Sequence, residues 1–171
     1  MLFDLINFDK VRRAIAWFGV LLLVLLVQNE VLSSITVYGA HFFIVPVALA
    51  AMAYFEGGVW GCVFGLFLGL FSDMYANGPA VLLAVVFPII GFLTGTAASY
   101  FVNKRFFAFF FVSLGVCFVT AICQGFRFAV FDGTPLLPLL FTVLLQTALA
   151  LPFTWLFYGP CRKLAAQNFG R

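Results

Sequence analysis

Long apolar runs constrain this chain more than any other feature of its sequence. A helix needs about 20 predominantly apolar residues to cross the hydrocarbon core of a bilayer. Six segments approach or reach that length, at roughly residues 11–28, 41–56, 57–74, 79–101, 105–131 and 136–158. The residues are 65% hydrophobic and 9% charged, whereas about a quarter of the residues in a soluble domain are charged. We therefore expect an all-α integral membrane protein, with residues 1–171 forming a single polytopic domain.

The distribution of positive charge predicts how such a bundle is oriented. Basic residues fall before the first run, between the fourth and fifth runs, and after the sixth. These clusters are Lys10, Arg12 and Arg13, then Lys104 and Arg105, then Arg162, Lys163 and Arg171. Cytoplasmic loops of membrane proteins carry the excess of lysine and arginine. Six spans with both termini in the cytoplasm put all three clusters on that side, whereas five spans would split them.

The third run, "GGVWGCVFGLFLGLFSD", carries a regular ladder of glycines at Gly57, Gly61, Gly65 and Gly69. In a bilayer, small residues at every fourth position let two helix backbones approach closely. The fourth run has a shorter version of the same pattern, with Gly91 and Gly95. The pattern predicts close helix packing at these six glycines. It leaves open whether the contact lies within one chain, between copies in a homo-oligomer, or with a partner helix.

The ladder ends at a carboxylate, Asp73, and an arginine, Arg127, is expected at similar depth near the outer end of the fifth span. Ionisable groups within spans are candidates for function. A carboxylate at a helix C-terminus faces the negative end of the helix dipole, so a compensating group is needed. Two alternatives stand open: Asp73 pairs with Arg127, or each side chain reaches the polar interface separately.

Few other residues suggest chemistry. His41 is the only histidine and the four cysteines are scattered, so we expect neither a catalytic triad nor a metal or cofactor site. The connections are short and hold no nucleotide-binding loop, so no nucleic-acid partner is expected. Glu56 suggests a solvated turn residue. Gln124 and Gln146 suggest hydrogen bonds between helices. The sequence therefore predicts a protein that is not an enzyme.

From Tyr38 to Phe101 the chain resembles the MreD family of bacterial rod-shape-determining proteins. The shared features are a glutamate–glycine turn at Glu56-Gly57, then G-x-x-x-G-L-x-x-G-L-x-x-D from Gly61 to Asp73. A loop glycine, Gly78, and G-x-x-x-G at Gly91 to Gly95 follow. The end of the first span also resembles a glutamine-bearing segment of the family, through Gln28. Near residue 40 the family usually has a proline or an aspartate after a glycine of the outer loop, and this chain has Ala40-His41 there instead.

The resemblance implies six transmembrane helices in a fold similar to the substrate-binding component of energy-coupling-factor transporters. It implies a scaffold of the cell-elongation machinery in the cytoplasmic membrane, which docks the bitopic protein MreC and helps to position sidewall peptidoglycan synthesis. Further partners implied are MreB, RodZ, and RodA with its penicillin-binding protein. The alternative is a substrate-binding subunit of a vitamin transporter. That reading needs an outward polar pocket, for which Asp73, Asn77, Gln124, Arg127 and Asp132 are the available groups.

Overall fold

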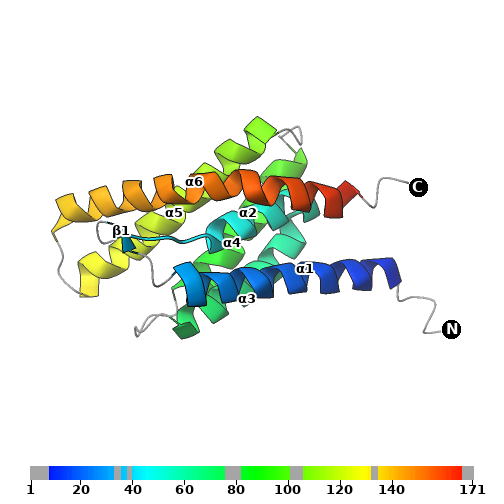
Figure 1. Cartoon of the computed structure of the whole chain (residues 1–171), viewed down its shortest axis with the longest axis horizontal. Helices are drawn as coiled ribbons and strands as arrows, with labels where there is room; N and C mark the ends of the chain where they lie inside the picture. The colour runs from blue at the N-terminus through cyan, green and yellow to red at the C-terminus, as the bar shows by residue number, and fades with distance from the viewer. Residues whose placement is uncertain are drawn as a thin grey trace.

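The chain folds into a bundle of helices with one very short hairpin. The computed structural model describes residues 8–32, 36–37, 40–75, 82–100, 106–131 and 135–166. In chain order the elements are α1 (Phe8–Val27), the π-helical η2 (Gln28–Leu32), β1 (Thr36–Val37), β2 (Ala40–His41), α2 (Val45–Glu56), α3 (Gly58–Tyr75), α4 (Leu83–Tyr100), α5 (Phe106–Phe131) and α6 (Leu136–Ala166). β1 and β2 pair antiparallel, with Thr36 opposite His41. The start of α1 and the end of α6 lie at the same end of the bundle (Figure 1).

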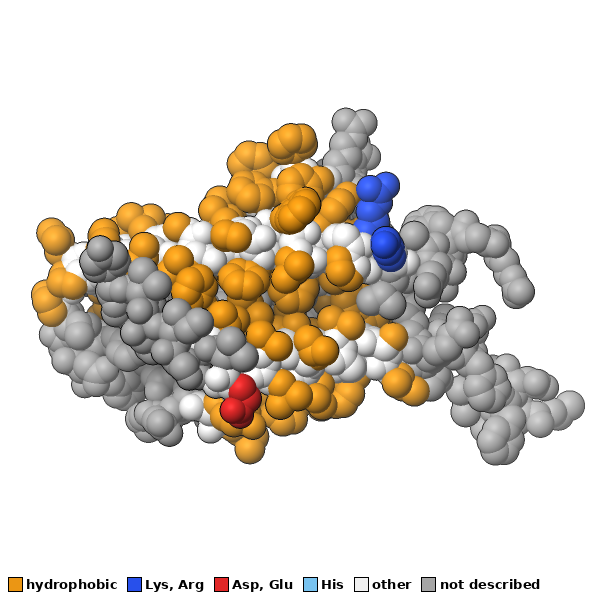
Figure 2. Space-filling model, in the orientation of Figure 1, with side chains coloured by type: hydrophobic (Ala, Val, Ile, Leu, Met, Phe, Trp, Pro, Cys, Tyr) orange, Lys and Arg blue, Asp and Glu red, His pale blue; other side chains and the backbone are white. Residues whose placement is uncertain are grey.

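Four of the helices are long and apolar enough to cross a membrane. They are α3, α4, Phe106–Phe126 of α5 and Leu137–Lys163 of α6. The two other described α-helices contribute shorter apolar stretches, Ile15–Glu30 and Val45–Glu56. Apolar side chains cover most of the described face in Figure 2, and basic side chains lie where α6 ends. This is the architecture of a multi-pass helical membrane protein.

Helix α2 forms the centre of the bundle. It contacts α1, α3, α4, α5 and α6, and every residue from Val45 to Phe55 is buried. Pro46 lies in the first turn, where a missing N–H costs no helical hydrogen bond. The 12 residues of α2 rise only about 18 Å, which is less than the hydrocarbon thickness of about 30 Å. Residues 42–44 lead into the helix as non-helical chain.

The helix ends differ from those that the apolar runs suggested. The run at 41–56 suggested a helix from residue 41, but α2 begins at Val45. The described part of α4 begins at Leu83 rather than near residue 79. At the other end of the chain α6 continues to Ala166, past the apolar run that ends near residue 158. Hydropathy locates apolar chain, whereas helix ends depend on which groups satisfy the terminal N–H and C=O groups.

Candidate functional site

The most extensive helix contact in the bundle joins α3 and α4, and it is built from the glycine ladder. A Cβ atom added at Gly61 would lie 2.5 Å from the carbonyl oxygen of Gly91, and one at Gly65 would lie 2.6 Å from that of Phe87. A Cβ at Gly69 would overlap the backbone of Leu83. The two helix backbones therefore touch along a line that only glycine permits. We call this line the α3–α4 seam.

The two glycines of the shorter ladder face the same seam from α4. A side chain at Gly91 would overlap the backbone of Gly61, and one at Gly95 would overlap the backbone at Gly57 and Gly58. The sequence left open whether the partner of the ladder belongs to this chain, and the structure places it in this chain, in α4. The seam therefore needs no second copy of the protein.

Gly57 has a different role from the other ladder residues. Its φ of +96° lies in a region that residues with a side chain rarely adopt, and an added Cβ would meet nothing within 4 Å. Gly57 therefore makes the sharp turn between α2 and α3. Gly58 is the residue that takes up the seam at this end, because a Cβ there would lie 2.9 Å from the carbonyl oxygen of Phe92.

Asp73 closes the opposite end of the seam as a helix cap. The N–H of Leu83 donates to Oδ1 at 3.2 Å and the N–H of Ala84 donates to Oδ2 at 2.8 Å. These are first-turn N–H groups of α4, which have no acceptor within their own helix. The positive end of the α4 dipole also favours a negative charge at this position. Asp73 thus lies at the unfavourable end of α3 because it serves the favourable end of α4.

The proposed pair of Asp73 with Arg127 rests on a side chain outside the described residues, since only the backbone of Arg127 is described, within α5. The helix dipole of α3 disfavours a carboxylate at Asp73, and the N–H groups of α4 supply the compensation that this position needs. Sequence reasoning looked for a cation and overlooked the neighbouring N-terminus. Asp side chains readily accept hydrogen bonds from first-turn N–H groups, but Asp73 lies ten residues before Leu83, so this contact depends on how α3 and α4 are placed.

Gln28 is a site that sequence reasoning did not single out on physical grounds. Its amide nitrogen donates to the carbonyl oxygen of Phe42 at 2.7 Å, and its Oε1 accepts from the N–H of Ile44 at 2.8 Å. The side chain is 6% exposed. Non-helical backbone at membrane depth is tolerated only where the protein satisfies it. Gln28 does this for the segment that enters α2, and it ties that segment to the end of α1.

Two further polar contacts join helices. The indole N–H of Trp17 donates to Oε1 of Glu56 at 2.6 Å, which ties α1 to the end of α2. The expectation that Glu56 is a solvated turn residue was therefore wrong, because this carboxylate is half-buried and hydrogen-bonded. The amide of Gln146 donates to Oε1 of Gln124 at 2.8 Å and joins α6 to α5, as their positions in the apolar runs suggested.

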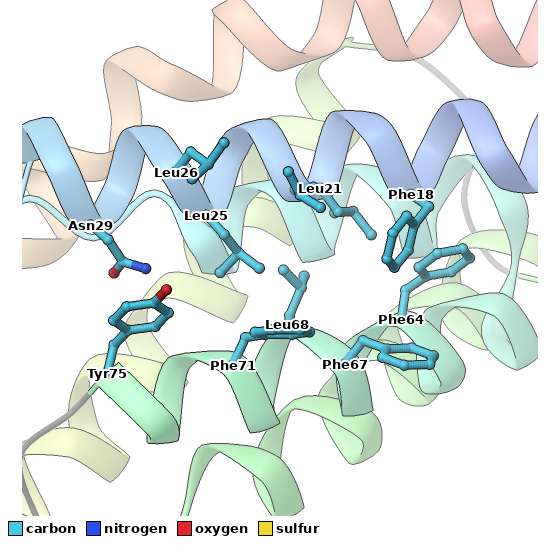
Figure 3. Close-up of a pocket in the computed structure, with 11 residues that line it drawn as sticks. Phe18, Leu21, Leu25, Leu26, Asn29, Phe64, Phe67, Leu68, Phe71 and Tyr75 are labelled. Carbon is cyan, nitrogen blue, oxygen red and sulfur yellow. The ribbon is translucent and has the colours of Figure 1, made fainter.

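An apolar groove of about 220 Å³ lies between α1 and α3. Phe18, Leu21 and Leu25 line it from α1, and Phe64, Leu68 and Phe71 line it from α3. Figure 3 shows these side chains along both walls, with Asn29 and Tyr75 together at one end. Among the described residues that line the groove, none carries a charge. We call it the α1–α3 groove.

Comparisons with known proteins identify no relative of this chain. No family model matches this chain, and neither a characterised protein nor a solved structure matches it. Within the described residues, no group of three His, Cys, Asp or Glu side chains could hold a metal ion. The candidate sites among the described residues are the α3–α4 seam with its Asp73 cap, the Gln28 contact and the α1–α3 groove.

Proposed function

We propose that this chain is a non-enzymatic membrane scaffold of the MreD type. It would lie in the bacterial cytoplasmic membrane with six spans and both termini in the cytoplasm. There it would dock a single-span MreC partner and help to position sidewall peptidoglycan synthesis. MreB, RodZ, and RodA with its penicillin-binding protein would belong to the same assembly.

One observation carries the proposal: the glycines and the aspartate of the motif G-x-x-x-G-L-x-x-G-L-x-x-D all contact the same neighbouring helix, α4. Gly61, Gly65 and Gly69 make the backbone contact with α4, and Asp73 caps the N-terminus of the same helix. Glycines and leucines at these spacings are common in membrane helices, so the motif alone is weak support for a family. The support is stronger when the glycines and the aspartate of the motif together build one helical hairpin.

The alternative, a substrate-binding transporter subunit, has less support. It requires free polar groups around a pocket, but the carboxylate of Asp73 is bonded to α4 and Gln124 is bonded to Gln146. The α1–α3 groove is apolar along most of its length. Asn77 and Asp132, with the side chain of Arg127, lie outside the described residues.

Because α4 occupies the glycine seam, a partner helix has to dock on another face of the bundle. The outward faces of α4, α5 and α6 carry bulky exposed side chains such as Ile89, Phe118 and Leu144. Helix association in lipid depends on van der Waals packing and not on hiding apolar surface, so docking on these faces would depend on how closely the partner's side chains fit between these bulky ones. The seam then contributes by keeping that surface rigid rather than by binding the partner itself.

The proposal predicts that the native host is rod-shaped, and depletion of the protein in that host tests it. We expect depleted cells to become round, and a wild-type copy to restore the rod. Gly65→Leu should fail to restore shape, because the leucine side chain has no room against α4. Gly19→Leu should restore it, because nothing lies within 4 Å of a Cβ at that position and Gly19 belongs to α1, outside the proposed docking faces of α4, α5 and α6. Depleted cells that keep their shape, and purified protein that retains a stoichiometric small molecule, would instead support the transporter.

A further inference from the structure

The α1–α3 groove is open along one side and closed at one end. Phe18 and Phe67 meet edge to face, with ring centroids 6.3 Å apart, where α1 and α3 approach each other. Figure 3 shows this aromatic end opposite the end marked by Asn29 and Tyr75. The rim between them is exposed and apolar, as at Leu22 (47% exposed) and Leu26 (54% exposed). In a bilayer such a rim faces the lipid chains directly.

The length of the groove corresponds to one leaflet. Phe18 and Asn29 are eleven residues apart on one helix run, and Phe64 and Tyr75 are eleven apart on α3. Each separation corresponds to a rise of about 16 Å. The hydrocarbon core is about 30 Å thick, so one leaflet accounts for about 15 Å. The aromatic end is therefore level with the bilayer midplane when the Asn29 end is level with the headgroup region.

The polarity of the groove follows the same axis. Its walls are phenylalanine and leucine up to the last turn, where Asn29 supplies an amide and Tyr75 a phenol that is 63% exposed. Amide N–H and phenol O–H groups can donate hydrogen bonds to ester or phosphate oxygens. Tyrosine also favours the membrane–water interface. A molecule that fits this groove is thus apolar for the depth of a leaflet and has oxygen acceptors at one end.

A second helix is a poor fit for the same groove. Helices that pack closely in lipid use small residues to bring backbones together, and in this chain the four glycines of α3 are already packed against α4. The groove walls are bulky, and the volume of about 220 Å³ is spread along a length of about 16 Å. That space suits a single flexible chain rather than a row of interlocking side chains.

We propose that the α1–α3 groove is a binding site for one acyl chain of a membrane phospholipid. The chain end lies at Phe18 and Phe67, and the glycerol ester lies at Asn29 and Tyr75. Since no described lining residue is charged, the site recognises the acyl chain and its ester and does not select the charge of the headgroup. This proposal is independent of the proposed scaffold function.

Photo-crosslinking tests the site and its direction. The full-length protein is reconstituted with phosphatidylethanolamine that carries a diazirine either at the end of one acyl chain or next to the ester. We expect the chain-end probe to label the segments around Phe18 and Phe67, and the ester-proximal probe to label those around Asn29 and Tyr75. The same pattern should appear when the probe is built on phosphatidylglycerol.

Matched variants separate the groove from the ordinary lipid-facing surface. Leu25→Trp adds bulk inside the groove and should reduce labelling of both segments several-fold, whereas Ile122→Trp on the exposed face of α5 should leave it unchanged. Leu22→Trp narrows the groove from its rim and replaces Leu25→Trp if size-exclusion chromatography shows that variant misfolded. The proposal fails if label spreads over α4–α6 in proportion to exposure. It also fails if both probes label the same residues.

Discussion

Replacing Gly65 with alanine tests the α3–α4 seam by adding a single methyl group. The added Cβ would lie 2.6 Å from the carbonyl oxygen, 2.8 Å from the carbonyl carbon of Phe87, and 3.0 Å from the nitrogen of Pro88. All three are backbone atoms, so no side chain can rotate away to make room. Ordinary contacts of a Cβ begin at 3.4 Å, so the two helices have to separate by about 0.8 Å at this point.

The energetic cost follows from that displacement. A radial gap of about 0.5–1 Å removes a quarter to a half of the dispersion energy of each atom pair that it separates. Insertion of a methyl group into close-packed structure typically costs about 1–3 kcal/mol. We expect Gly65→Ala to lower the free energy of unfolding by about that amount, and Gly65→Leu to lower it further. A gain in helix propensity from alanine opposes the loss only in part.

The assay is equilibrium unfolding of the purified protein in mixed micelles, with tryptophan fluorescence as the signal. Gly115→Ala and Gly19→Ala are matched controls, because both lie within helices and an added Cβ meets nothing within 4 Å. The controls should unfold at or slightly above the wild-type midpoint. The seam as described is wrong if Gly65→Ala is as stable as Gly115→Ala.

Three further predictions use the same unfolding assay. Asp73→Ala should cost about 0.5–2 kcal/mol through loss of the α4 cap, and Asp73→Asn should cost less; equal losses would argue against the cap. Gln28→Leu leaves the buried N–H of Ile44 without its acceptor and should cost about 1–3 kcal/mol, so wild-type stability would contradict that contact. Leucine at Gln124 and at Gln146, singly and together, should give a coupling of about 0.6 kcal/mol, and strictly additive losses would exclude the hydrogen bond.

The positions of the helices along the chain were easier to predict from the sequence than the contacts between them. Apolar runs locate membrane helices because the bilayer imposes a length and a composition on each crossing. The ladder from Gly61 to Gly69 predicted close packing, since small residues are needed wherever backbones touch. Periodicity carries no information about which helix fills the groove, so only the structure identifies α4 as its occupant.

The polar residues were harder to interpret because their partners are backbone groups or distant side chains. Asp73 was recognised as needing compensation, but its acceptors serve α4 N–H groups ten and eleven residues away. Gln28 lies at the end of an apolar run, where an amide normally suggests the interface. Its contact follows from the non-helical residues before α2, which hydropathy treats as part of a helix. Glu56 was misjudged for the same reason, since its donor is on α1.

Affinity purification from native membranes tests the scaffold proposal most directly. The full-length protein is tagged, extracted in mild detergent, and its companions are identified by mass spectrometry against a Gly65→Leu sample of matched expression. We predict that a single-span protein with a coiled-coil region co-purifies in stoichiometric amount with the wild type and is depleted from the Gly65→Leu sample. Recovery of the wild type without such a protein, but with a stoichiometric small molecule, would contradict the scaffold function.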